Sequence, residues 1–412
     1  MSIDFEEQLT RTLEGAAERA PLPAGDPVAA VRMRQRRSRR RRAGIAVACV
    51  VAATAAVLVG TRLAVPSPNP APAPEYVFAP DRIPDFTDLP GPDKVWPNAV
   101  HRLPAKLPDG YRYSVVAVLG DDRYLVTRGL FNGEPAPSVF NTRTGTVTAL
   151  GTSAVTDGLA MSRVLMAREL NGKAVWFLEG SRNNRFVREA WVAPLDGSSA
   201  TRLANLPDGS APRFSPSGNG IIWEYQTGQT WKSNIIRRVS LSGGPVGDIP
   251  RTLGFEVANI APWITKRTSN GKPNVAGELR DVANGKRLRW TAAPGLQDVR
   301  CGPTWCTGIG TGDHIAVQAL DGSDVVELPV RGMLSPTRNG RLAVGYIERP
   351  DAAEQVVWDR TTGRAATMLP RRPSDPLSSA TQQNPTADEE PEVLTVTANG
   401  NELVVLDLRA IG

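Results

Sequence analysis

Two cysteines lie close enough along the chain to react with each other. Cys301 and Cys306 enclose the sequence Gly-Pro-Thr-Trp, and a short turn containing Gly and Pro can bring two thiols together. In an oxidising compartment such a pair forms a disulfide, which is what the spacing predicts. The alternatives are free thiols and metal binding, for which the chain offers no second Cys/His pair. The third cysteine, Cys49, lies in an apolar run and is interpreted as a small apolar side chain.

The other side chains that could do chemistry do not form a catalytic pattern. The two histidines, His101 and His314, lie in separate segments, and no Gly-x-Ser-x-Gly nucleophile motif occurs. The acidic pairs at 121–122 and 389–390 stand beside turn or loop residues, where solvated carboxylates are common. We therefore predict no enzyme activity, no cofactor and no metal site. The alternative is a hydrolase whose catalytic carboxylates come together only in the folded chain, at the centre of a ring of repeats. Spacing along the chain does not show which acids meet there.

The basic charge is concentrated directly before the most apolar segment. The formal net charge is +6, and residues 1–42, with ten arginines against six acids, account for +4 of it. A basic run in this place indicates the cytoplasmic flank of a membrane segment, so no nucleic-acid partner is expected. Eight of these arginines stand close together: Arg32, Arg34, Arg36, Arg37, Arg39, Arg40, Arg41 and Arg42.

Residues 43–60, AGIAVACVVAATAAVLVG, contain no charged side chain. At about 1.5 Å per residue, a helix of this length would reach roughly 27 Å, close to the thickness of the hydrocarbon core of a bilayer. The segment predicts one transmembrane helix with the N-terminus in the cytoplasm and the following residues outside. The alternatives are a buried helix and a cleaved export signal, including a twin-arginine signal, in which Arg42 would occupy a position that favours an apolar residue.

One face of the predicted span carries only small residues, which recur at every fourth position. Small side chains let two helices approach closely, so a weak dimer through the span is one expectation. Half of the segment is Ala or Gly, so composition alone also explains the pattern. The residues of this face are Gly44, Ala48, Ala52, Ala56 and Gly60.

Before the arginine run, residues 4–20 predict a short amphipathic helix. Phe5, Leu9 and Leu13 fall on one face, acids occupy the first turn, and Pro21 ends the pattern. Such a helix could dock onto a cytoplasmic regulatory protein. The alternative is a helix that only lies on the membrane surface.

The segment after the predicted span is rich in proline. The sequence SPNPAPAPEY favours an extended polyproline II conformation, at about 3.1 Å per residue, and would hold a folded domain away from the bilayer. The expected organisation is therefore a cytoplasmic segment (1–42), a transmembrane helix (43–60), an extracytoplasmic linker (61–94) and a folded domain (95–412).

Beyond residue 95 the sequence is repetitive. Short β-rich hairpins recur, and each turns on a glycine that follows a small or polar residue. The spacing between these glycines, 37 to 52 residues, is typical of propeller blades. Because one blade cannot bury both of its faces alone, the repeats predict stacking around a ring. The turn residues are Gly145, Gly197, Gly243, Gly285, Gly322 and Gly363.

The predicted inner-strand segments number seven, which favours an all-β propeller of seven blades, with six or eight as alternatives. The last segment, at 392–408, has no outer hairpin before Gly412. The sequence HRLPAKLPDG at 101–110 resembles TRLANLPDG at 201–209. We therefore expect a strand near Val100 to close the ring against the C-terminal strands. The nine tryptophans should pack mostly between blades, and Trp231, in a polar stretch, is the best candidate for an exposed contact.

The unit that begins Ser-Pro-Ser-Gly at 215–218, with its apolar strands and x-Asp-Gly-x hairpins, resembles TolB-like propeller repeats. This resemblance covers residues 95–412 and implies a platform that binds other proteins. The unit departs from the pattern because it lacks the Asp usual before the Gly, and several units lack Ser-Pro. The whole layout also looks like that of actinobacterial single-pass membrane proteins associated with sigma factors. Residues 1–42, however, lack the His and Cys residues of zinc-type anti-sigma factors.

Together these features predict a single-pass cell-membrane protein. Its extracytoplasmic propeller would bind an unidentified protein or envelope ligand, and its cytoplasmic helix would contact a regulatory protein such as a sigma factor. A passive envelope scaffold is the second hypothesis, and a propeller hydrolase is the third.

Overall fold

The computed structural model divides the chain into two compact units, Met1–Pro72 and Ala73–Gly412. The predicted cytoplasmic helix, arginine run and span lie outside the described residues, among which no helix is long and apolar enough to cross a membrane. The structure describes residues 82–128, 134–151, 153–206, 214–216, 219–226, 233–258, 260–267, 276–349, 353–368, 391–398 and 401–412.

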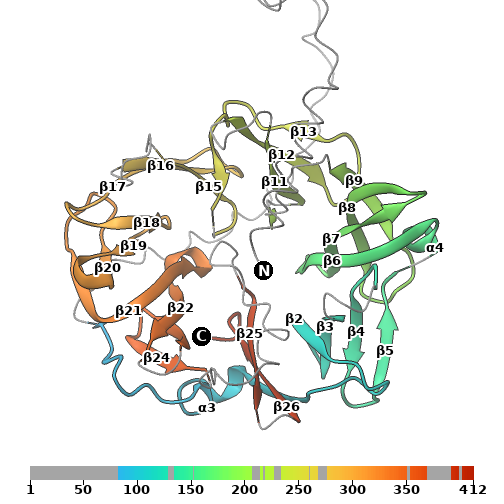
Figure 1. Cartoon of the computed structure of the whole chain (residues 1–412), viewed down its shortest axis with the longest axis horizontal. Coiled ribbons are helices and arrows are strands. Elements are labelled where there is room, and N and C mark those ends of the chain that lie inside the picture. Colours follow the sequence, from blue (N-terminus) through green and yellow to red (C-terminus); the bar gives the residue numbers. More distant parts are fainter. Residues whose placement is uncertain are drawn as a thin grey trace, which may run out of the picture. The chain divides into compact units, whose positions relative to one another are not determined.

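The described residues form antiparallel β-sheets, and the first four sheets each contain four strands in sequence order (Figure 1). The first sheet contains β2 (Tyr113–Gly120), β3 (Arg123–Arg128), β4 (Ser138–Asn141) and β5 (Thr146–Ala149). The second contains β6 (Leu159–Leu170), β7 (Lys173–Arg182), β8 (Arg185–Pro194) and β9 (Thr201–Leu206). The third contains β10 (Phe214–Pro216), β11 (Gly220–Gln226), β12 (Asn234–Ser240) and β13 (Gly247–Asp248). The fourth contains β14 (Glu256–Val257), β15 (Trp263–Arg267), β16 (Ala276–Asp281) and β17 (Arg287–Thr291).

A seven-stranded sheet supplies two further blades, which share the long strand β21 (Val326–Thr337). The first part of β21 pairs with β20, and its last six residues pair with β22. One half of this sheet adds β18 (Gln297–Cys301), β19 (Cys306–Ile309) and β20 (His314–Gln318). The other half adds β22 (Leu342–Glu348), β23 (Ala353–Asp359) and β24 (Arg364–Thr367). The described helical segments are α3 (Pro92–Val95), η2 (Pro97–Ala99), α4 (Ser153–Thr156), η4 (Thr311–Asp313) and η5 (Arg338–Gly340).

The seventh blade joins the two ends of the domain. It contains β25 (Val393–Ala398), β26 (Glu402–Asp407) and β1 (Val100–Pro104), in the order β25-β26-β1. The β1–β26 register runs from Val100 opposite Leu406 to Pro104 opposite Glu402. The predicted closing strand is therefore confirmed, and it pairs with a strand edge that would otherwise be open.

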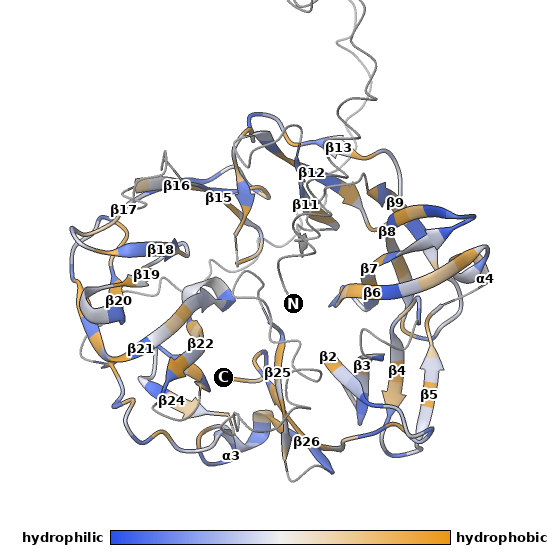
Figure 2. Ribbon diagram, in the orientation of Figure 1, coloured by the Kyte–Doolittle hydropathy of each residue, from blue (hydrophilic) through white to orange (hydrophobic). Residues whose placement is uncertain are grey.

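Apolar side chains fill the spaces between neighbouring blades. Polar and apolar residues are mixed along the strands (Figure 2), and central strands such as β7 contain continuous buried apolar runs. Seven core clusters are found among the described residues, and each spans one pair of neighbours, including the pair formed by the seventh and first blades. The eight described tryptophans are all buried, as expected for packing between blades. Trp231 lies outside the described residues. The fold is thus a seven-bladed β-propeller whose cores all lie within Ala73–Gly412.

The hairpin turns occur at the six predicted glycines, and all six have positive φ. Gly285 illustrates the reason. Its φ is 78°, a conformation that costs an L-residue energy, and its N–H donates to the Asp281 carbonyl at 2.8 Å. The Asp281 carboxylate accepts the N–H of Ala283 at 2.8 Å, which fixes the start of the same turn.

Part of the predicted linker, which was expected to end at residue 94, packs on the sixth blade. Phe86 is fully buried, and its ring meets Trp358 edge-on at 5.9 Å. The carbonyl of Pro90 accepts the N–H of Thr367, in the outer strand β24, at 3.0 Å. A single aromatic residue among prolines has no periodicity, so the sequence carried no signal for this contact.

Candidate functional site

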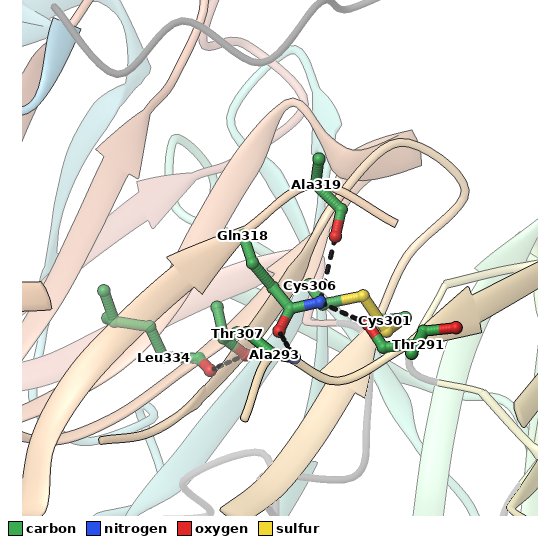
Figure 3. Close-up of a disulfide and its surroundings, with 8 residues drawn as sticks. All are labelled: Thr291, Ala293, Cys301, Cys306, Thr307, Gln318, Ala319 and Leu334. Atoms are coloured by element: carbon green, nitrogen blue, oxygen red, sulfur yellow. Dashed lines mark hydrogen bonds between the residues drawn. A yellow bond between two sulfur atoms is a disulfide. The ribbon is translucent and has the colours of Figure 1, made fainter. Parts of the chain in front are cut away.

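The structure joins Cys301 and Cys306 by a disulfide (Figure 3). Cys301 ends β18 and Cys306 begins β19, and the two residues lie directly opposite each other in the ladder between these strands. The bridge closes the turn that joins the first two strands of the fifth blade.

Polar side chains near the disulfide bond strands of the fifth blade to neighbouring segments (Figure 3). The fully buried Gln318 accepts the N–H of Ala293 at 2.9 Å through Oε1 and donates to the Thr291 carbonyl at 2.7 Å through Nε2. The Thr307 hydroxyl donates to the Leu334 carbonyl, in the next blade, at 2.8 Å. Because each of these buried side chains bonds to the main chain of another segment, both contribute to structure.

Trp305, inside the disulfide-closed turn, connects the fifth and sixth blades. Its indole Nε1 donates to the Gly340 carbonyl at 2.6 Å, and the guanidinium carbon of Arg360 lies 3.9 Å from its ring centroid. Burial lowers the pKa of Arg360 to about 10. The disulfide therefore shapes a turn whose tryptophan is part of an inter-blade contact.

The histidines are not brought together. His101 lies in β1, where its Nδ1 is 3.2 Å from the Tyr124 hydroxyl, and His314 begins β20 in another sheet. Asp122 forms an exposed ion pair with Arg143 at 2.8 Å, and residues 389–390 lie outside the described part. Within the described ranges, no group of three or more His, Cys, Asp or Glu residues is placed to hold a metal ion.

The sequence did not predict a charged cluster at the ring closure. Arg409, just after β26, donates to the Val118 carbonyl in β2 and to the Glu169 carboxylate in β6, the latter at 2.9 Å. Its guanidinium also lies 3.6 Å from Glu392 and 3.6 Å from Asp407. One arginine of the seventh blade thus ties that blade to the first and second. We call this group the Arg409 cluster and define it as Arg168, Glu169, Arg338, Glu392, Asp407 and Arg409.

Glu392 is a buried carboxyl group of the Arg409 cluster. Its side chain is only 14% exposed. Burial raises its pKa from 4.5 to about 7, with Glu169 acting in the same direction, while Arg168, Arg409 and Arg338 oppose the change. Desolvation therefore outweighs the nearby positive charges. A carboxyl group of this kind exchanges a proton near neutral pH, which is the property of a pH-sensitive contact or of a general acid or base.

The Arg409 cluster could not be predicted from the sequence for two reasons. Arg409 and Glu169 are 240 residues apart, and nothing in the repeat pattern pairs the end of one blade with the first strand of another. Glu392 ends a polar, proline-bearing stretch, residues 371–392, whose composition is typical of a loop. Glu392 directly before β25 and Arg409 two residues after the end of β26 were the only local signal.

No protein-family model matches the sequence, and neither does any curated protein. Solved structures do match. A puromycin hydrolase shares 18% identity at a TM-score of 0.43, with 71% of this chain and 49% of that chain covered. TolB from Acinetobacter baumannii shares 15% sequence identity at a TM-score of 0.36, with 61% of this chain and 65% of that chain covered. An oligogalacturonate lyase in complex with manganese shares 11% sequence identity at a TM-score of 0.46, with 76% of this chain and 98% of that chain covered.

The chain spans about half the length of the puromycin hydrolase that it matches. The similar structures include TolB, the protein whose repeats the sequence resembles.

Proposed function

We propose that this chain is a membrane-anchored binding protein. Its extracytoplasmic propeller binds a protein or envelope ligand, and its cytoplasmic segment contacts a regulatory protein such as a sigma factor. The observation that carries the proposal is a closed, disulfide-bearing ring that follows an apolar segment with an arginine-rich N-terminal flank. Structural disulfides persist in oxidising compartments, and arginines accumulate on the cytoplasmic side of a span.

Binding is favoured over catalysis by the way the charged groups are used. Glu169, Glu392 and Asp407 converge, but they surround one arginine, and Arg409 also accounts for the link between blades. His101 and His314 lie in different sheets. A propeller presents its turns at the two ends of the ring, and such turns supply variable binding surfaces on a rigid scaffold.

The orientation is tested with a reporter that is active only outside the cytoplasm. Fused after Gly412, it should be active, and the full-length chain should remain in the membrane fraction. The matched control carries the reporter after Arg42 and should be inactive. A shortened, soluble and exported product would contradict the anchor and identify residues 43–60 as part of a cleaved signal.

The regulatory contact is tested with residues 1–42 as bait in a two-hybrid screen. A specific cytoplasmic partner is expected, and its signal should be lost when Phe5, Leu9 and Leu13 are changed to serine. Repeated screens without a specific partner would reject this half of the proposal and favour a passive envelope scaffold.

A second candidate function is acid–base catalysis, which the near-neutral pKa of Glu392 favours. Panels of glycoside and ester substrates would be assayed with the wild type, with Glu392→Gln and with the control Glu354→Gln. Activity lost only in Glu392→Gln would support a hydrolase. Activity that survives this substitution would exclude Glu392 as its acid or base.

A further inference from the structure

The second blade has an unusually long central hairpin. The strands β7 and β8 pair through ten residue pairs, which end at Arg182 opposite Arg185, whereas the equivalent strands β22 and β23 of the sixth blade form seven. At about 3.4 Å per residue, three more pairs extend the hairpin by roughly 10 Å. The turn residues Asn183 and Asn184 both have positive φ, 50° and 61°, as in the tight turns that fix a two-residue hairpin loop.

Two large apolar side chains are exposed at the end of this hairpin. Phe186 is 55% exposed and Met161 is 89% exposed. Met161 has a φ of 47° and lies in an irregular part of β6, next to Ala160. Ala160 pairs with Ser181, which in turn pairs with Phe186, so both apolar residues lie at the same end of the sheet. A strained, non-glycine residue that exposes an apolar side chain is an outlier that calls for a functional explanation.

Arginines surround these apolar residues. Glu179 pairs with both Arg163 and Arg188, each at 2.7 Å, and the guanidinium carbon of Arg188 lies 5.3 Å from the Phe186 ring centroid. Arg185, at the turn, is exposed. We define the second-blade tip as Met161, Arg163, Arg182, Arg185, Phe186 and Arg188.

The arginines outnumber the acids around the second-blade tip. Two of the arginines, Arg182 and Arg202, share the carboxylate of Glu189, each at 3.0 Å. Among the described residues, the charged side chains at this end of the blade are Arg163, Arg182, Arg185, Arg188 and Arg202 against Asp157, Glu179 and Glu189. Five positive charges against three negative charges leave a local charge of +2.

We propose that the second-blade tip docks onto an anionic lipid surface, with Phe186 and Met161 entering the interface and the exposed Arg163 and Arg185 facing lipid phosphates. This inference rests on the proposed membrane anchor, since the anchored chain would hold the tip close to such a surface. An exposed aromatic residue among arginines matches the boundary between lipid headgroups and acyl chains in both polarity and charge.

A lipid surface fits the second-blade tip better than a protein does. A stable protein interface buries about 800 Å² on each partner, over some 20–30 residues. The tip is the end of three neighbouring strands and offers two large exposed apolar side chains. A fluid surface needs no complementary shape, so a narrow apolar projection with a surplus of arginines is sufficient.

The length of the connecting chain is compatible with this contact. Residues 61–81, between the predicted span and the first described residue, number twenty-one. Even a fully extended chain of this length reaches no more than about 75 Å. The anchored propeller would therefore remain near the bilayer, where a weak contact is favoured by high effective concentration.

The contact is tested by co-sedimentation of residues 73–412, which contain all seven described core clusters, with lipid vesicles. Vesicles of phosphatidylcholine alone are compared with equal parts of phosphatidylcholine and phosphatidylglycerol. Binding is expected only to the anionic vesicles and should weaken as salt is added. Arg185→Glu and Phe186→Ser should each lower the partition coefficient roughly five-fold or more.

The matched controls are Arg364→Glu and Val246→Ser, exposed residues of other blades, which should bind like the wild type. Near-ultraviolet circular dichroism checks that every variant is folded. Vesicle binding that is absent, or that survives both tip substitutions, overturns the proposal, as does a tip that captures only a protein. Because this assay omits residues 43–60, a failure of the lipid contact is distinguishable from a failure of the anchor, which the reporter fusion measures.

Discussion

Replacing Glu392 by glutamine should change how the stability of the ring depends on pH. Burial raises the pKa of this carboxyl from 4.5 to about 7, so the folded ring binds the proton more tightly than the unfolded chain does. The stability that this proton contributes is fully present below pH 4.5 and is lost as the pH rises through about 7. Above that range, folding must bury a charged carboxylate.

The size of the effect follows from the two pKa values. Their difference, 7 − 4.5, is about 2.5, which corresponds to about 3 kcal/mol of unfolding free energy. Glutamine has nearly the same shape and stays neutral at every pH. Glu392→Gln should therefore match the wild type in acid and exceed its unfolding free energy by up to about 3 kcal/mol near pH 8.

Urea unfolding of residues 73–412, followed by tryptophan fluorescence, would measure this difference. The comparison is made at about pH 5 and about pH 8, with Glu348→Gln, an exposed carboxyl in β22, as the matched control. A stability difference that is equal at the two pH values would refute the reasoning. It would mean that Arg409 and Arg168 keep Glu392 charged in the folded ring.

Three other changes test the ring by the same unfolding assay. Removing the disulfide with Cys301→Ser and Cys306→Ser should cost only about 2 kcal/mol, because the closed loop is short, and the wild type with reductant should then behave like the variant. Leu103→Ala, at a 3% exposed position in the closing strand, should cost about 2–5 kcal/mol, and an unchanged urea midpoint would argue against closure through β1. Gly285→Ala should cost about 1–2 kcal/mol because of its positive φ, so a neutral result would contradict the turn assignment.

The parts of the fold that repeat were predictable from sequence. Each turn glycine is a local requirement for positive φ, so Gly145 and Gly363 could be identified without knowing their neighbours. Ring closure by the strand at Val100 was predictable because a repeat that lacks its outer strand must find one elsewhere in the chain. Cys301 and Cys306 needed only a short turn between them.

The parts that depend on tertiary contact were not predictable. Arg409 meets Glu169 only because the ring places the seventh blade beside the first and second. The same arginine on an open sheet would be an ordinary surface residue. The pKa of Glu392 depends on burial, and burial depends on that same arrangement. A repeat pattern specifies how one blade is built, whereas this cluster arises where the ring closes.

The segment before β1 explains how the ring can remain closed while it is attached to another part of the chain. Under the proposed anchor, any pull from the membrane reaches Phe86 before it reaches Val100. Phe86 is fully buried against Trp358, and its carbonyl accepts a hydrogen bond from Arg349. A force on the linker must therefore extract an aromatic side chain from the sixth blade before it can peel β1 from β26. The contacts of Phe86 thus protect the closing strand β1 from a force on the linker.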